Sequence, residues 1–201
     1  MNLPKISNNF PLILASKSPR RKALLDQVRL PYQVSPSRIK EEAPGLTAQE
    51  ATLMLAFKKA VDVAKREGNK WILGADTMVL IDGQVLGKPE DLYEARKMLE
   101  MLNGKVHQVI TGFCLISPAR EVAHQEAVTT QVQFKELSAN EIESYINTGE
   151  PLGKAGGYAI QGIGAFMVES ISGSYTNVVG LPLCSLIKAL IAVGAIDSFP
   201  L

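Results

Sequence analysis

Two consecutive arginines near the start of the chain are the first residues whose type and position suggest chemistry. Arg20 and Arg21 follow Ser18-Pro19, a pair typical of a helix start. The first helical turn carries unpaired N–H groups and a partial positive charge, so a cation there is unfavourable by about 0.3 to 1 kcal/mol. An anion resolves this conflict, because the N–H groups, the Ser16 or Ser18 hydroxyl and both guanidinium groups donate toward negative oxygens. Phosphate fits best; the alternative is that the arginines pair with nearby acids or extend into solvent.

An acid within an apolar stretch is the second candidate. Asp76 lies in "ILGADTMVLI", where strand alternation places it on one face with Met78 and Leu80. A buried carboxylate without a partner is unfavourable, so we expect Asp76 to be paired, protonated, metal-bound or at the floor of a cleft. A structural salt bridge, or a bulge near Gly74, is the plainer alternative.

Taken together, the arginines and Asp76 indicate a reaction class. An acid, a metal ion and cationic groups that hold phosphate are what the hydrolysis of a phosphoanhydride requires. Glu41 and Glu42 are candidate ligands for Mg²⁺, which usually takes only one or two protein carboxylates. Lys59 and Lys88 are candidates to neutralise phosphate charge, although a lysine stem packed on the surface is the commoner outcome. The P-loop pattern is absent from the sequence, which counts against the usual nucleotide triphosphatase folds.

The elements that must position these residues alternate between strands and helices. Apolar and β-branched runs predict strands at residues 12–15, 32–36, 71–81, 84–87, 105–116 and 124–137. Caps and helical spacing predict helices at residues 19–28, 48–67, 92–103, 139–149 and 181–193. Asp82-Gly83 is typical of a two-residue hairpin turn. The pattern predicts a mixed α/β sheet flanked by helices, with a single domain over residues 1–201.

Composition excludes several classes of protein. The 201 residues are 46% hydrophobic and 20% charged, which is ordinary globular composition. A formal charge of +1 and 6% aromatic residues give no support for a broad nucleic-acid or membrane surface. Cys114 and Cys184 lie in apolar runs without metal-ligand spacing, and we expect both to be reduced core residues. The first residues lack the apolar region of a signal peptide, so we expect a cytoplasmic protein.

Seven short motifs occur in an order and spacing that resemble one family. They are "ASKSPRR", "LAFKKA", "GADTMV", "GKP", "HQVITG", "GEPLGKAGGYAIQG" and "GSYTNVVGLP". Over nearly its whole length the sequence resembles the Maf family of nucleoside triphosphate pyrophosphatases. The resemblance implies an elongated, two-lobed α/β fold with a central cleft, usually dimeric. It also implies hydrolysis between the α and β phosphates with Mg²⁺ or Mn²⁺, giving a nucleoside monophosphate and pyrophosphate.

The resemblance implies roles for individual residues. Asp76 of "GADT" matches the general base that activates water, and Glu41 of "RIKEE" matches an acidic position that helps Asp76 hold the metal ion. By the same motifs, the residues implied to bind substrate are Ser16, Arg20, Arg21, Lys59, Thr77, Lys88 and Gln161.

The motifs also resemble one subgroup of the family. Arg20, Thr77 and Gln161 are similar to the subgroup that acts on dTTP and UTP, rather than the one that acts on 7-methyl-GTP. A glutamine amide offers a donor and an acceptor, which suits the imide edge of uracil or thymine. Gly153 departs from the subgroup, in which most members have an aspartate before "KAG", and this puts the efficiency of metal binding in question. Two alternatives stay open: a regulator of cell division that binds nucleotide without turnover, and a 7-methyl-GTP pyrophosphatase.

Overall fold

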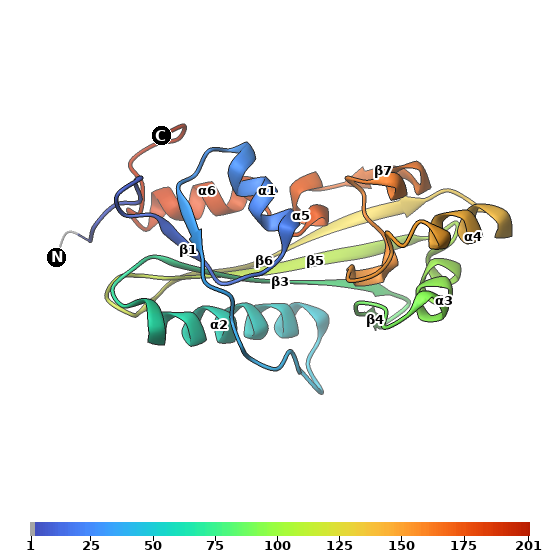
Figure 1. Ribbon diagram of the computed structural model, residues 1–201, viewed down its shortest axis with the longest axis horizontal. Coiled ribbons are helices and arrows are strands. Elements are labelled where there is room, and N and C mark those ends of the chain that lie inside the picture. The colour runs from blue at the N-terminus through green and yellow to red at the C-terminus, as the bar shows by residue number, and fades with distance from the viewer. Residues whose placement is uncertain (1–2) are drawn as a thin grey trace. The chain divides into compact units, whose positions relative to one another are not determined.

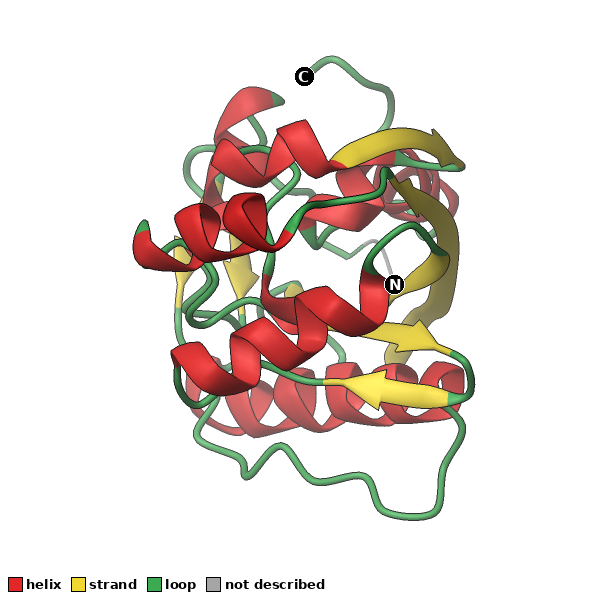
Figure 2. Ribbon diagram, turned by 90° about the vertical axis from the view of Figure 1, so that its right-hand side faces the viewer, coloured by secondary structure: helices red, strands yellow, loops and turns green. Residues whose placement is uncertain are grey.

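Strands and helices alternate along the chain in the computed structural model, which describes residues 3–201 (Figure 1, Figure 2). The strands are β1 Leu12–Leu14, β2 Tyr32–Val34, β3 Ile72–Ile81, β4 Gln84–Leu86, β5 Val106–Ile116, β6 Val122–Phe134 and β7 Val168–Ser172. The α-helices are α1 Pro19–Gln27, α2 Ala48–Glu67, α3 Leu92–Leu102, α4 Ala139–Asn147, α5 Tyr175–Val179 and α6 Leu183–Ala192. Two 3₁₀ helices, η1 Ala155–Gly157 and η2 Ile163–Met167, lie in the glycine-rich segment.

The strands form one mixed sheet. Its order is β2-β1-β3-β5-β6-β7, and β4 pairs with β3. β1 is parallel to both β2 and β3, whereas the β3–β4 and β6–β7 pairs are antiparallel. The predicted mixed α/β sheet is therefore confirmed, including the hairpin at Asp82-Gly83.

Helices α1 to α4 begin where the sequence predicts, and α6 begins two residues after its predicted start. The Ser18 hydroxyl accepts from the backbone N–H of Arg21, with Pro19 in the first turn of α1. Complete capping boxes open α2 and α4: in α2, Thr47 and Glu50 each accept from the other's backbone N–H. These caps satisfy N–H groups that the helix itself leaves unpaired.

The chain divides into two compact units. The first unit contains residues 3–76, Thr111–Val128 and Gly180–Leu201, and the second contains Thr77–Ile110 and Thr129–Val179. Strands β3, β5 and β6 contribute residues to both. The single domain, the elongated shape and the central cleft stay predictions.

The core of the first unit lies between α2 and the strands that it covers. In Figure 1, α2 runs along one face of the sheet, with α1 and α6 on the opposite face. Two strand glycines allow a very close approach: a Cβ added at Gly74 would lie 2.1 Å from the Ala56 carbonyl oxygen, and one at Gly112 would lie 2.6 Å from the Thr52 carbonyl oxygen. The buried apolar residues of this cluster are Ile13, Ala15, Ala56, Ala60, Val63, Ala64, Ile72, Cys114 and Ile116.

The second unit has a core of its own around α3 and α4. Its largest fully buried side chains are Tyr145 and Phe134, and it includes Leu99 and Leu102 from α3. β7 was not predicted, because the sequence of residues 149–173 indicates only glycine-rich turns, and no helix was predicted over the short α5 that follows. The short β7 exists through its long-range pairing with β6.

The prediction that both cysteines are core residues is wrong for Cys184. Both thiols are free, but Cys114 is buried and Cys184 is exposed. In α6 the neighbouring Leu183 and Leu186 face the core instead. Among the helices of residues 3–201, none combines the length and apolarity needed to cross a membrane.

Candidate active site

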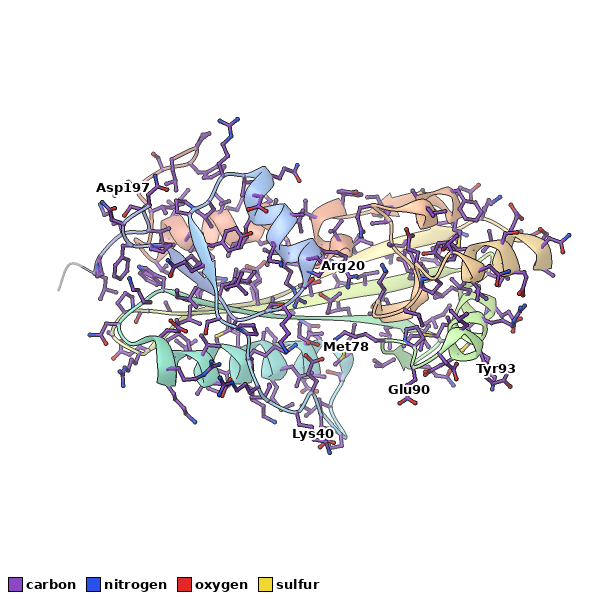
Figure 3. All side chains as sticks on the ribbon, in the orientation of Figure 1. Arg20, Lys40, Met78, Glu90, Tyr93 and Asp197 are labelled. Atoms are coloured by element: carbon purple, nitrogen blue, oxygen red, sulfur yellow. The ribbon has the colours of Figure 1, made fainter. Side chains whose placement is uncertain are left out.

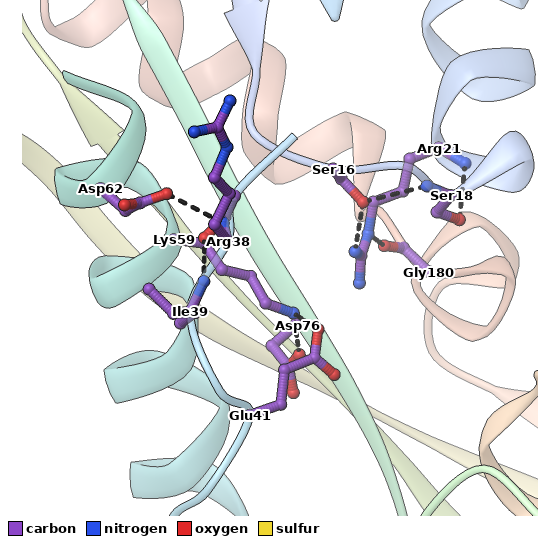
Figure 4. A network of polar contacts seen from close by, with 11 residues as sticks. Ser16, Ser18, Arg21, Arg38, Ile39, Glu41, Lys59, Asp62, Asp76 and Gly180 are labelled. Atoms are coloured by element: carbon purple, nitrogen blue, oxygen red, sulfur yellow. Dashed lines mark hydrogen bonds and ion pairs between the residues drawn. The ribbon is translucent and has the colours of Figure 1, made fainter. Parts of the chain in front are cut away.

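Two carboxylates meet on a single lysine in the first unit. Lys59 Nζ donates to Oδ1 of Asp76 at 2.6 Å and lies 2.7 Å from Oε1 of Glu41 (Figure 4). Lys59 and Asp76 are each only 6% exposed, whereas Glu41 is exposed. Of the alternatives open for Asp76, the structure shows the paired one, and the ammonium group offsets the loss of solvent around the carboxylate.

The close packing of α2 on β3 brings this pair together. Gly74 and Asp76 are two residues apart on β3, so they share one face of the strand. Because Gly74 lacks a side chain, the α2 backbone at Ala56 and Ala60 approaches the strand directly. Lys59 lies in the same stretch of α2, and its side chain reaches Asp76.

The segment that carries Glu41 is tied to α2 by two residues that the sequence analysis missed. Oδ2 of Asp62 accepts from the backbone N–H of Arg38 at 3.0 Å (Figure 4). Arg66 Nη2 donates to the Pro36 carbonyl at 2.9 Å. The Arg38 N–H, followed by Arg66, lowers the pKa of Asp62 below its ordinary value. Asp62 and Arg66 are four residues apart on α2 and form an ion pair. This spacing could have predicted the ion pair, but not its contacts with the segment that carries Glu41.

Arg21 is a buried residue that joins α1 to the chain near residue 180. Its Nε donates to the Gly180 carbonyl at 2.8 Å, and its Nη1 donates to Ser16 Oγ at 3.0 Å (Figure 4). Burial lowers the pKa of Arg21, while the charges of Asp76 and Glu41 act in the opposite direction. Arg21 therefore lies within electrostatic range of the carboxylates that surround Lys59.

Arg20 differs from its neighbour. Its side chain is half-buried at the start of α1 (Figure 3), and burial lowers its pKa. Among residues 3–201, no acid forms an ion pair with it. The positive charge of Arg20 further lowers the pKa of Arg21. The amino end of α1 thus presents a partly desolvated cation without an internal counterion.

Three predicted substrate residues belong to the second unit. Thr77 follows Asp76 on β3 and is half-buried, while Lys88 and Gln161 are exposed. The carbonyl of Gly87 accepts from the backbone N–H of Gly156 at 3.0 Å, so the "GKP" and "GGY" motifs lie side by side. Gln161 lies in the turn between η1 and η2.

The carboxylates of the first unit suit a hard divalent cation. No group of three or more histidine, cysteine or acidic side chains arranged for a metal exists within the described part of the chain, residues 3–201. However, Glu41 and Asp76 already converge on one positive group, the Lys59 ammonium. Mg²⁺ commonly uses only one or two carboxylates, with water and substrate phosphates as its other ligands. The residues present therefore fit the predicted metal ion.

Comparison with known proteins decides the family. The family described as Maf-like protein matches residues 11–193. This chain belongs to the Maf family. A dTTP/UTP pyrophosphatase from Syntrophotalea carbinolica is 48% identical over 193 residues, covering 94% of this chain and 87% of that protein. One of the same name from Citrifermentans bemidjiense is 47% identical over 191 residues, covering 94% and 99%.

Similarity of this Maf chain to solved structures is more distant. The Staphylococcus aureus Ham1 protein is 17% identical with a TM-score of 0.44, covering 62% of this chain and 71% of that one. A similarity of this size supports no conclusion about function.

Proposed function

We propose that this chain hydrolyses dTTP and UTP to the nucleoside monophosphate and pyrophosphate. The observation that carries the proposal is the convergence of Asp76 and Glu41 on Lys59, with Arg21 within electrostatic range of both carboxylates. In addition, Arg20 has no acidic partner among the residues that the structure describes, 3–201. Cations and carboxylates arranged in this way suit a polyanionic substrate and a water-activating base. The choice of dTTP and UTP is supported by the names of the similar proteins and by the large share of each chain over which they match.

In this proposal Asp76 acts as general base. It takes a proton from a water molecule whose oxygen attacks the α-phosphorus of the substrate. The bond between that phosphorus and the α–β bridging oxygen breaks, and the bridging oxygen leaves with pyrophosphate. A base at this position typically contributes about 10²- to 10⁴-fold to the rate.

The cations of the site hold the phosphates. Arg20 donates to phosphate oxygens, and Lys59 exchanges part of its pairing with Asp76 for contact with the substrate. Ser16 and Lys88 are the further proposed phosphate-binding residues. Arg21 is fixed by Gly180 and Ser16, so it contributes charge and orientation to the site.

A divalent cation, Mg²⁺ or Mn²⁺, completes the proposed site. Glu41 and Asp76 would hold it, and when bound it supplies positive charge that offsets the charge of the phosphates. Gly153 stands where most members of the similar subgroup have an aspartate, so in this proposal metal binding depends more heavily on Glu41 and Asp76.

In this proposal, Gln161 and Thr77 bind the pyrimidine base of the substrate. The Gln161 amide offers a donor and an acceptor to the imide edge of uracil or thymine.

The resemblance to the family extends the proposal to a homodimer in the cytoplasm. Sedimentation velocity of the purified protein tests whether it is a dimer.

A panel of nucleoside triphosphates with separate assays for pyrophosphate and orthophosphate tests this function. We expect pyrophosphate from dTTP and UTP with Mg²⁺ or Mn²⁺, and little from 7-methyl-GTP. The Asp76→Asn variant is the matched control for contaminating activity. Tight nucleotide binding with no turnover above that control would contradict the proposal and favour a nucleotide-binding regulator.

A further inference from the structure

The Glu150 carboxylate accepts three hydrogen bonds, two of them from the segment around Gln161. Its Oε2 accepts from the backbone N–H of Ile163 at 2.9 Å, and its Oε1 accepts from that of Gly164, also at 2.9 Å. The third donor is the Tyr145 hydroxyl, at 2.9 Å from Oε1. One carboxylate thus joins the end of α4 to the first turn of η2.

Tyr145 continues the network to the other side of Gln161. Its hydroxyl oxygen accepts from the backbone N–H of Ala159 at 3.2 Å, and its side chain is only 2% exposed. Ala159 and Ile163 each lie two residues from Gln161, one before it and one after it. The Tyr145–Glu150 pair therefore holds the backbone on both sides of the exposed Gln161.

Two glycines show how closely this network fits the backbone. A Cβ added at Gly162 would lie 2.3 Å from Glu150 Oε2, and one added at Gly164 would lie 2.8 Å from the Tyr145 hydroxyl. The backbone N–H of Gly162 also donates to the Ala159 carbonyl at 3.1 Å, which closes a tight turn around Gln161. The backbone at both glycines thus lies directly against the Glu150 carboxylate and the Tyr145 hydroxyl.

The negative charge of Glu150 strengthens the hydrogen bonds that it accepts. Burial alone would raise the pKa of Glu150, but the N–H groups of Gly164 and Ile163 and the Tyr145 hydroxyl outweigh burial and lower it. An ionised carboxylate accepts stronger hydrogen bonds than a neutral one.

We propose that Glu150 and Tyr145 are positioning residues that fix Gln161 for recognition of the pyrimidine base. This inference rests on the proposed function, because it takes Gln161 as the residue that reads the base. Hydrogen bonds to a base lose their value when the donor and acceptor shift by about 1 Å, so a recognition residue on a turn needs support of this kind. In the proposed function most of the phosphate-binding residues belong to the first unit, whereas the network lies in the second. We therefore expect loss of the network to weaken binding of the pyrimidine base and to leave binding of the phosphates unchanged.

Calorimetric binding of two separate probes tests the inference without turnover. Uridine monophosphate reports on base recognition, and inorganic triphosphate reports on the phosphate site. We expect Glu150→Ala and Tyr145→Phe each to weaken uridine monophosphate binding on the order of tenfold and to leave inorganic triphosphate binding unchanged. In the double variant the loss should be close to that of either single change, because both residues belong to one network.

Three further variants guard against a merely structural explanation. Glu150→Gln keeps one carbonyl oxygen for Tyr145 and Gly164 and should recover part of the affinity; it also replaces Glu150→Ala if that variant fails to fold. Gly162→Ala crowds the carboxylate without removing it and should weaken uridine monophosphate binding too. Glu100→Ala is the matched control, because it removes an exposed acid of α3 in the same unit, and should leave binding of both probes unchanged.

The outcomes separate this inference from the proposed function. Unchanged uridine monophosphate binding in the network variants, or an equal loss for both probes, would overturn the inference. So would a wild-type protein that binds inorganic triphosphate but no uridine monophosphate. The proposed function fails separately, if the wild-type protein releases no pyrophosphate from UTP or dTTP.

Discussion

The two adjacent arginines at the start of α1 have different surroundings and therefore different expected roles. Arg21 is 8% exposed and donates to Gly180 and Ser16, whereas Arg20 is half-buried without an ion pair among residues 3–201. The sequence predicted one anion site for both arginines. It did not distinguish them, because the contact with Gly180 joins residues far apart in the chain.

Alanine substitutions should separate these roles. We expect Arg20→Ala to raise KM for UTP roughly tenfold with little change in stability, because it removes a charged hydrogen-bond donor to phosphate. Arg21→Ala should lower the free energy of unfolding by about 1 to 3 kcal/mol, because it leaves the Gly180 carbonyl without its donor. Steady-state kinetics and urea denaturation measure the two effects. Equal loss of stability in both variants would contradict this assignment.

The Lys59–Asp76 pair is a second residue-scale feature with a measurable consequence. Removing only the lysine leaves a buried carboxylate uncompensated, so Lys59→Met should lower the free energy of unfolding by about 3 to 5 kcal/mol. The double variant Lys59→Met/Asp76→Asn should be more stable than Lys59→Met, because no buried charge is left alone. Urea denaturation of the four proteins in this cycle measures the coupling. Additive losses would show that the pair contributes no interaction energy.

At the scale of the elements, the contact between α2 and β3 positions the candidate site. Gly74→Ala adds a Cβ that would lie 2.1 Å from the Ala56 carbonyl, so the helix or the strand must move. We expect a loss of stability of about 1 to 3 kcal/mol and a lower kcat, because Lys59 and Asp76 no longer align. Gly87→Ala is the control for stability, since its added Cβ meets nothing within 4 Å. Equal stability of the two variants in thermal unfolding would contradict the proposed close packing.

Most helices and strands were predictable because their signals are local. Capping boxes at Thr47 and Ser138 and the turn at Asp82-Gly83 depend on neighbours in sequence, and the structure confirms each. β7 and the Glu150 network depend instead on contacts between distant segments. In the same way, the sequence predicted that Asp76 needs a partner, but the identity of Lys59 as that partner depends on how α2 packs on β3.

At the scale of the whole molecule, the buried His107 makes the free energy of unfolding depend on pH. It is 1% exposed, its Nε2 is 2.8 Å from the Tyr158 hydroxyl, and burial lowers its pKa from 6.5 to about 4. Between these values the unfolded chain binds a proton that the folded protein does not, so stability falls as pH falls from 6.5 to about 4. The stability that the neutral, buried His107 contributes is fully present above pH 6.5.

Thermal unfolding of wild-type protein and His107→Gln across this pH range measures that contribution. The variant should be less stable at neutral pH but should lose less stability on acidification, because glutamine does not titrate. Other titrating groups act on both proteins alike, so the difference isolates His107. Parallel stability curves for the two proteins would show that His107 does not control this pH dependence.

The most direct test of the account follows an oxygen atom from water. UTP is hydrolysed by the wild-type protein in water labelled with heavy oxygen, and both products are analysed by mass spectrometry. We expect one labelled oxygen in uridine monophosphate and none in pyrophosphate, with the rate reduced about 10²- to 10⁴-fold in Asp76→Asn. Label in pyrophosphate, or release of labelled orthophosphate, would contradict attack at the α-phosphorus.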